Sequence, residues 1–189
     1  NLLTFHSLMV GDFRPNTPTY NFDQFFESTS TITSPRIIEN PSNIALRSLV
    51  PGNVTGPIVG GNLTSLVNTL GTPYELDTSG KILVIEETGA PSNTIYRYLI
   101  QLLMSGKFDD CLGIVIGQCT NCLVSYGTTF DDLINALLVP LGKPMIANLA
   151  TGHGYYKTTI PIGATVHLNA TEPSLTVLEA TVQVENPNV

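Results

Sequence analysis

Four consecutive apolar residues stand at the centre of the segment Lys81–Glu87, which reads KILVIEE. An unbroken apolar run of this length is typical of a strand that is buried on both faces in a parallel sheet. Similar runs occupy Leu112–Gly117 and Pro144–Leu149. We therefore expect these three segments to be strands of one mostly parallel sheet.

Helical patterns lie between these strands. Asn62 can cap a helix that ends at Gly71, and Asn93 can cap a longer helix that ends at Gly106. A third capped helix is expected over Thr129–Leu138. The alternation of strands and helices predicts an α/β fold, in which helices flank a mostly parallel sheet.

The two ends of the chain follow other patterns. The apolar run Leu2–Val10 predicts a buried strand, and residues 14–19 and 28–44 predict loops on either side of a short amphipathic piece. Near the other end, apolar and polar residues alternate in Ala164–Asn169 and Ser174–Val182. This alternation predicts a β-hairpin that closes the fold.

The composition excludes two classes of partner. Of the 189 residues, 42% are hydrophobic and 12% are charged, and the formal net charge is −7. An acidic chain with few Lys and Arg has no electrostatic footprint for nucleic acid or an anionic membrane surface. No run approaches the roughly 18 apolar residues of a membrane-spanning helix, and no leader pattern opens the chain. Low Lys content with abundant Ser, Thr and Asn favours a secreted chain over a cytosolic one.

The three cysteines allow several interpretations. Cys119 and Cys122 have the spacing of a redox pair or of half a zinc site, and Cys111 lies upstream. Zinc needs about four ligands, and His153 is the only histidine expected nearby. We therefore expect a structural disulfide or buried thiols, with no metal and no cofactor.

Two titratable residues follow the ends of predicted parallel strands, where functional groups collect in open α/β sheets. Glu86 ends the strand Lys81–Glu87, and His153 lies in a glycine-rich turn after the strand Pro144–Leu149. They could form an acid–base pair, or Glu86 could cap a helix while His153 fills a turn. Because successive strand residues face opposite sides, only one of Glu86 and Glu87 can point at His153.

The order of short motifs along nearly the whole chain resembles the LD-carboxypeptidase family of serine peptidases, which includes the microcin C self-immunity proteins. Near its start, Leu3-Thr4-Phe5-His6 followed by Met9 and Asp12-Phe13 resembles the family segment that follows the nucleophile. The other matching motifs are Gly60-Gly61-Asn62-Leu63-Thr64, Gly71-Thr72-Pro73-Tyr74, Gly80–Glu86, Arg97 with Leu99, Gly113–Gly117, Gly142-Lys143-Pro144, Gly152-His153-Gly154 and Pro161–Ala164.

This resemblance implies a Ser–Glu–His triad that removes a D-amino acid from an L-residue in peptidoglycan tetrapeptides. Glu86 would take the position of the acid and His153 that of the base. The assignment agrees with the chemistry, because a serine hydroxyl needs a neighbouring imidazole to accept its proton and a carboxylate to orient that imidazole. Arg97 could bind a substrate carboxylate or form a surface ion pair.

The third member of the triad is missing from the sequence. The family serine lies in a Gly-x-Ser-Asp-x-Thr turn, and no serine of this chain is followed by aspartate. The resemblance therefore implies the carboxyl-terminal half of such an enzyme, with residues 1–50 as a connecting segment and residues 51–189 as the carboxyl-terminal α/β domain. Its partners would be the amino-terminal half and a peptide substrate, and a homodimer is a further expectation. We expect the apolar face toward the amino-terminal half to include Leu2, Leu3, Phe5 and Met9.

Departures from the family pattern bear on the substrate more than on the fold. Gln118 stands where the family usually has an acid, Tyr96 stands where it usually has aspartate, and Ser7-Leu8 follows His6 in place of Gly-Pro. Two hypotheses follow from the sequence. One is a hydrolase half that works with a segment carrying the nucleophile, and the other is a catalytically inactive binding or structural protein that retains the fold.

Overall fold

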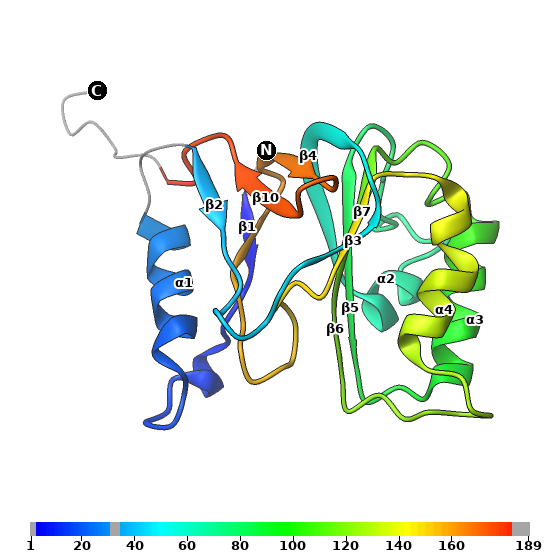
Figure 1. The fold of residues 1–189 in the computed structure, drawn as a ribbon, viewed down its shortest axis with the longest axis horizontal. Coiled ribbons are helices and arrows are strands. Elements are labelled where there is room, and N and C mark those ends of the chain that lie inside the picture. Colours follow the sequence, from blue (N-terminus) through cyan, green and yellow to red (C-terminus); the bar gives the residue numbers. More distant parts are fainter. Residues whose placement is uncertain (1–2, 31–34, 183–189) are drawn as a thin grey trace.

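Four parallel strands form the centre of the molecule in a computed structural model, which describes residues 3–30 and 35–182. The strands pair in the order β4, β5, β6 and β7, and a helix follows each of the first three (Figure 1). The strands are β4 Asn53–Asn62, β5 Ile82–Thr88, β6 Gly113–Thr120 and β7 Met145–Ala147. The helices are α2 Leu63–Asn68, α3 Ser92–Met104 and α4 Phe130–Leu137. The expected α/β architecture is confirmed.

Antiparallel strands extend this centre on both sides. In the described ranges the sheet has the order β2-β10-β9-β4-β5-β6-β7-β3. The added strands are β2 Arg36–Ile38, β3 Arg47–Val50, β9 Thr165–Asn169 and β10 Ser174–Val177. The strand β1 Thr4–His6 pairs separately with β8 Ile160–Ile162, and helix α1 Thr19–Ser30 lies on the side of the molecule opposite α3 and α4 (Figure 1). Two 3₁₀ turns, η1 Val10–Asp12 and η2 Val139–Leu141, complete the elements.

The side chains of β5 alternate between two hydrophobic cores. Leu83 and Ile85 pack in the core that contains the apolar faces of α3 and α4. Ile82 and Val84 pack in the opposite core, with apolar side chains of β8, β9 and β10. This burial on both faces is the physical reason for the unbroken apolar run in the sequence.

Helix starts agree with the capping pattern in two of three cases. Asn62 Oδ1 accepts a hydrogen bond of 3.1 Å from Ser65 N at the start of α2, as expected. At α4, Thr129 Oγ1 accepts from Asp132 N and Asp132 Oδ2 accepts from Thr129 N, which is a capping box. The capping role predicted for Asn93 is wrong, because α3 begins at Ser92.

A loop explains the early start of α3. Ser92 N donates a hydrogen bond of 2.8 Å to Leu123 O, so the segment after β6 satisfies the first amide of the helix. At the other end, Gly106 has a φ of +69° and its amide donates to Leu103 O, as a glycine stop requires. Tertiary contacts rather than a local side chain therefore define the first residue of this helix.

The chain ends differ more from the expectation. The strand predicted over Leu2–Val10 is limited to β1, and residue 2 lies outside the described ranges. The segment 28–44, expected as loop, contains β2, which pairs with β10. The hairpin of β9 and β10 is confirmed, but it ends at Val177 and joins the main sheet through β9 and β4. The division into residues 1–50 and 51–189 stays a prediction.

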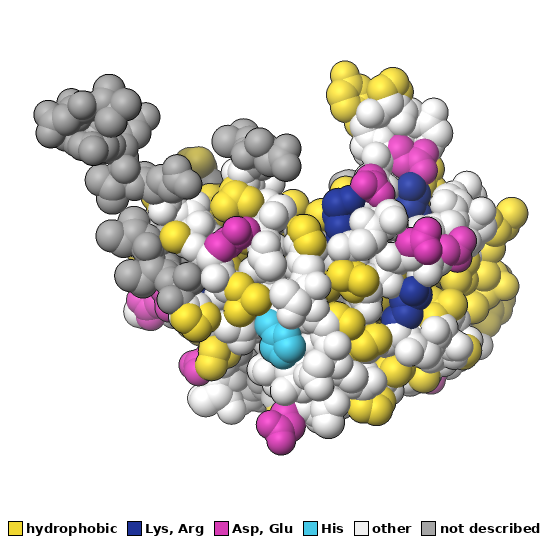
Figure 2. All heavy atoms as spheres, turned by 90° about the horizontal axis from the view of Figure 1, so that it is seen from above, with side chains coloured by type: hydrophobic (Ala, Val, Ile, Leu, Met, Phe, Trp, Pro, Cys, Tyr) yellow, Lys and Arg dark blue, Asp and Glu magenta, His cyan; other side chains and the backbone are white. Residues whose placement is uncertain are grey.

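Positively charged side chains are sparse on the surface shown in Figure 2, as the composition predicts. Over the described atoms of the face in Figure 2, Lys and Arg side chains are few and lie apart from one another, some of them beside acidic ones, so they form no continuous positive patch. No helix within residues 3–30 and 35–182 is both long enough and apolar enough to cross a membrane.

Candidate active site

Glu86 lies at the carboxyl end of β5 with a side chain that is 0% exposed. The alternation along β5 turns it to the side of Val84, away from the helices α2 to α4. Gly117 of the neighbouring strand β6 makes room for it, because a Cβ at that position would lie 2.9 Å from Glu86 Cβ. The carboxylate is therefore buried between two strands and points to the loop that follows β7.

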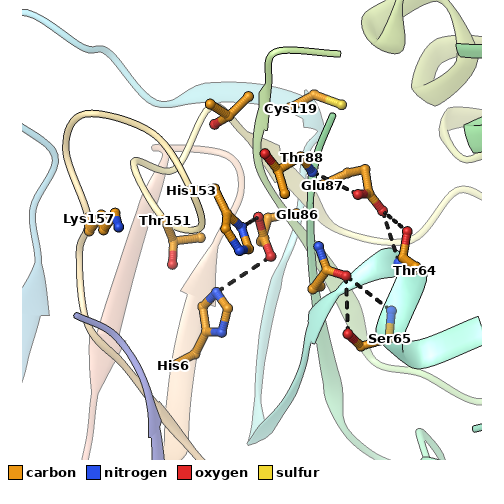
Figure 3. A network of polar contacts seen from close by, with 12 residues as sticks. His6, Thr64, Ser65, Glu86, Glu87, Thr88, Cys119, Thr151, His153 and Lys157 are labelled. Carbon is orange, nitrogen blue, oxygen red and sulfur yellow. Dashed lines mark hydrogen bonds and ion pairs between the residues drawn. The ribbon is translucent and has the colours of Figure 1, made fainter. Parts of the chain in front are cut away.

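His153 lies in that loop and contacts the carboxylate directly. Its Nδ1 lies 2.9 Å from Glu86 Oε2 (Figure 3). Because a carboxylate only accepts hydrogen bonds, Nδ1 carries the proton, and Nε2 of the neutral ring is left as an acceptor. The side chain of His153 is 41% exposed, so this acceptor can be approached from outside. Of the two arrangements that the sequence left open, a pair or two separate local roles, the structure has the pair.

Helix α1 holds the loop that carries His153. The buried Asn21 side chain donates to Tyr155 O at 3.0 Å and accepts from Lys157 N at 2.9 Å. One helical turn later, Gln24 Oε1 accepts a hydrogen bond of 2.8 Å from Thr158 Oγ1. Amide side chains of α1 thus replace the regular backbone pairing that a loop lacks.

Glu87, the neighbour of Glu86, points to the opposite side of the sheet (Figure 3). Its Oε2 accepts hydrogen bonds from Thr64 N at 2.9 Å and Thr64 Oγ1 at 2.7 Å, at the start of α2. Its Oε1 accepts from Thr88 N at 2.8 Å. Glu87 therefore caps a helix, and Glu86 is the carboxylate that faces His153.

A pocket of about 240 Å³ opens beside His153. It is lined by Phe5, His6, Ser7, Leu8, Met9, Asp12, Gly152, His153 and Lys157. Lys157 Nζ and Asp12 Oδ1 form an ion pair of 2.8 Å at this pocket. Burial acts to raise the pKa of the Asp12 carboxyl, but hydrogen bonds from Lys157 and from Met9 N outweigh it and leave that pKa lowered.

A larger pocket of about 650 Å³ is lined by residues of β6, α4 and the loop after β7. Gln118, one of the departures from the family pattern, is among them, together with Arg47, Tyr155 and Tyr156. Arg47 is already paired there, since its Nη2 lies 2.7 Å from Asp131 Oδ2. The side chains around this pocket therefore offer mainly neutral polar and aromatic groups.

A second histidine approaches Glu86, and the sequence did not predict this contact. His6 Nε2 lies 3.8 Å from Glu86 Oε1, so the carboxylate stands between two imidazoles (Figure 3). Burial lowers the pKa of His6 below its ordinary value. The signal in the sequence was the place of His6 in a motif of the resembling family, but no spacing rule links it to Glu86.

Arg97 lies apart from this pair. It is exposed on α3, where its Nη2 donates a hydrogen bond of 3.1 Å to Thr94 Oγ1, and it does not line the pocket beside His153. Its role in substrate binding stays a prediction.

The three cysteines form one disulfide and one buried thiol. Cys119 and Cys122 form a disulfide, and Cys111 is a buried free thiol whose Sγ donates to Phe108 O at 3.6 Å. Burial raises the pKa of the Cys111 thiol. The expectation of a disulfide or buried thiols is therefore confirmed. Within the described ranges, no group of three or more His, Cys, Asp and Glu side chains is arranged to hold a metal ion.

A family model described as "LD-carboxypeptidase C-terminal domain" matches residues 55–168. The chain belongs to this family. A Bacillus subtilis protein named "Probable murein peptide carboxypeptidase" is 34% identical over 95% of this chain, which covers 56% of that relative's length. The "Murein tetrapeptide carboxypeptidase" of Pseudomonas aeruginosa is 32% identical over 61% of this chain and is covered over 38% of its own length.

Solved structures of the LD-carboxypeptidase family share the fold. The muramoyltetrapeptide carboxypeptidase of Oxalobacter formigenes has a TM-score of 0.79 at 27% identity, over 94% of this chain and 62% of that one. The microcin C7 self immunity protein MccF has a TM-score of 0.87 at 17% identity, over 96% of this chain and 62% of that one. The 189 residues therefore correspond to part of the length of these relatives.

Proposed function

We propose that Glu86 and His153 are the acid and the base of a Ser–Glu–His triad that hydrolyses an L–D peptide bond in murein-type peptides. The observation that carries this proposal is the 2.9 Å contact between a fully buried carboxylate and a half-exposed imidazole at the carboxyl ends of parallel strands. Membership in the LD-carboxypeptidase family supports the reaction class.

The pair has a defined role in each step. His153 Nε2 takes the proton of the serine hydroxyl while the serine oxygen attacks the carbonyl carbon, and Glu86 stabilises the resulting imidazolium. The imidazolium then gives that proton to the nitrogen of the departing D-amino acid, and an acyl-enzyme remains. Water hydrolyses the acyl-enzyme with the same imidazole as base, which restores the serine hydroxyl.

We infer that the serine is supplied by a segment outside these 189 residues, as the resemblance implies. Ser7 is a serine that lines the pocket, but its Oγ is hydrogen-bonded to Thr159 Oγ1 rather than to His153. A covering segment would also bury exposed apolar side chains, since Met9 is 65% and Val10 is 91% exposed. Leu3 and Phe5, expected in the same face, are partly buried, and Leu2 lies outside the described ranges.

The test is turnover of a murein tetrapeptide by the complete protein, measured as release of the terminal D-amino acid. Glu86→Gln and His153→Ala should each lower kcat by about 10⁴-fold or more. His167→Ala is the matched control, because His167 contacts Thr55 at 2.9 Å elsewhere on the surface and should leave kcat unchanged. The 189-residue chain alone should show no turnover, and robust hydrolysis by it would mean that another residue is the nucleophile.

The alternative is a catalytically inactive binding or structural protein that retains the peptidase fold. The pocket of about 650 Å³ that Gln118 lines favours it, because this pocket offers neutral polar and aromatic groups to a ligand. A complete protein that binds the tetrapeptide without releasing a D-amino acid would support this alternative.

A further inference from the structure

Glu86 uses one of its carboxylate oxygens in the contact with His153 and leaves the other unpaired. Oε1 is buried and has no hydrogen-bond partner within the described residues. An unpaired buried oxygen is unusual, because it has lost its hydrogen bonds to water on folding and gains none in the protein, which costs free energy. The group that faces it is His6, whose Nε2 lies 3.8 Å away.

We propose that His6 is a positioning residue for Glu86, which donates its Nε2–H to Oε1 and keeps the carboxylate turned toward His153. This inference rests on the proposed function, since it names a residue that supports the same pair. A movement of less than about 1 Å brings the two atoms into the usual range of about 2.7–3.2 Å. Hydrogen bonds of catalytic groups are often long in the free enzyme and shorten when substrate binds.

The surroundings of His6 fix its direction. It lies on β1, where it pairs with Ile160 of β8 in an antiparallel register. Gly61 of β4 lies beside the ring, since a Cβ at that position would lie 3.6 Å from His6 Nδ1. The pairing of β1 with β8 thus fixes the backbone of His6, and its Nε2 is directed at Glu86 (Figure 3).

The charge state of His6 suits this role. Burial lowers the pKa of His6, the Glu86 carboxylate raises it, and His153 and Lys157 lower it further. The titratable groups that face His6 are thus Glu86 from β5 and His153 with Lys157 from the loop after β7, and Lys157 is itself paired with Asp12 of η1. A neutral His6 can donate a hydrogen bond without placing a second positive charge beside the His153 imidazolium.

Two substitutions in the complete protein test whether the N–H donor of His6 or only its ring is required. His6→Phe keeps a planar ring without a donor, whereas His6→Gln keeps an N–H donor of similar reach that does not titrate. We expect His6→Phe to lower kcat about 10- to 100-fold, because this is the effect of losing one hydrogen bond to a charged group. KM should change less than about twofold. His6→Gln should recover most of the lost kcat.

Two kinetic outcomes overturn the proposal. One is a wild-type kcat in His6→Phe. The other is a His6→Gln variant as slow as His6→Phe, since ring packing rather than the donor would then be the requirement. Melting curves of both variants identify any general loss of folding.

A measurement on the resting protein distinguishes this inference from the proposed function. With ¹⁵N-labelled histidine, NMR at neutral pH should find His6 uncharged with its proton on Nε2. A proton on Nδ1 alone, or a fully charged ring, overturns the inference whatever the activity. If the wild-type protein releases no D-amino acid, the proposed function fails. The tautomer of the His6 ring still decides in that case whether His6 donates to Glu86.

Discussion

Gly152 determines how closely the loop after β7 can approach β5. Its φ is +106°, and a Cβ at this position would lie 2.2 Å from Glu86 Oε2. Only a residue without a side chain allows a backbone to pass so near a buried carboxylate. The contact between Glu86 and His153 therefore depends on a neighbouring residue that has no functional group.

Gly152→Ala should separate the two members of the pair. The new methyl group has to displace the loop or the carboxylate, and a misplacement of about 1 Å costs about 100-fold in rate. We expect kcat to fall by at least that factor in the tetrapeptide assay. Gly127→Ala is the matched control, because Gly127 has a φ of +74° with nothing within 4 Å of the added Cβ. Similar activities of the two variants would contradict this account.

The strand pattern alone left the choice between Glu86 and Glu87 open, and the family resemblance assigned Glu86 as the partner of His153. Alternation along a strand predicts that the two carboxylates face opposite sides, but it does not predict on which side the histidine lies. The contact of His6 with Glu86 could not be predicted, because it depends on the pairing of β1 with β8, which are far apart in the sequence.

The start of helix α2 depends on a side chain from the neighbouring strand. Replacing Glu87 with Gln removes a charge that accepts from Thr64 N, Thr64 Oγ1 and Thr88 N. We expect the free energy of unfolding to fall by about 1–3 kcal/mol, since at least one partly buried donor loses its acceptor. Urea denaturation measures this loss.

Two comparisons make the Glu87 prediction specific. Glu172→Gln, at an exposed carboxylate in the turn between β9 and β10, should change the free energy of unfolding by less than about 0.5 kcal/mol. Glu87→Gln should also keep most of its kcat at a temperature where it is folded, unlike Glu86→Gln. A stable but inactive Glu87→Gln variant would reverse the roles assigned to the two carboxylates.

The capping box of α4 makes stability depend on pH. Hydrogen bonds from the Thr129 hydroxyl and amide lower the pKa of the exposed Asp132 carboxyl below its ordinary value of 3.8. Because the pKa is lower in the folded state, the contribution of Asp132 is fully present well above 3.8 and is lost as the pH falls through and below that value. Asp132→Asn should therefore destabilise the protein at neutral pH and have a smaller effect near about pH 3. Thr129→Ser, which keeps the hydroxyl, should retain the wild-type pH profile, and an equal loss at both pH values would contradict the prediction.

The long elements could be predicted from sequence, whereas the short ones could not. Strand β5 is long enough to show an unbroken apolar run, and helix α3 is long enough to show its helical period. Strands β2 and β3 have only three and four residues, too few for an alternation to be recognised. Both lie at edges of the sheet, so their partners, rather than their own side chains, determine that they are strands.

The whole molecule has a characteristic pattern of thiol reactivity. Cys111 is buried with a raised pKa, and Cys119 and Cys122 are joined. A thiol reagent should therefore label the folded, unreduced protein slowly, label Cys111 after unfolding without reductant, and label all three cysteines after reduction. Rapid labelling of the folded protein would contradict the burial of Cys111. Because the disulfide closes a very short loop, reduction should lower the stability by at most about 2 kcal/mol.

The order of all strands in the sheet could not be predicted from the sequence. The patterns indicated a parallel centre and a hairpin, and both are present. The link between them is the extension of β4, which pairs with β5 along one part and with β9 along another. Residues 53–62 were too polar and too rich in glycine to be recognised as one long strand.

The two adjacent carboxylates of β5 make this protein sensitive to changes in length. An insertion or deletion of a single residue before Glu86 would shift the strand by one position and exchange the sides that Glu86 and Glu87 face. The contact of Glu86 with His153 and the capping of α2 by Glu87 would then be lost together, even with every type of side chain preserved. Strand β5 of this chain should therefore accept exchanges of one apolar residue for another but no change in length before Glu86.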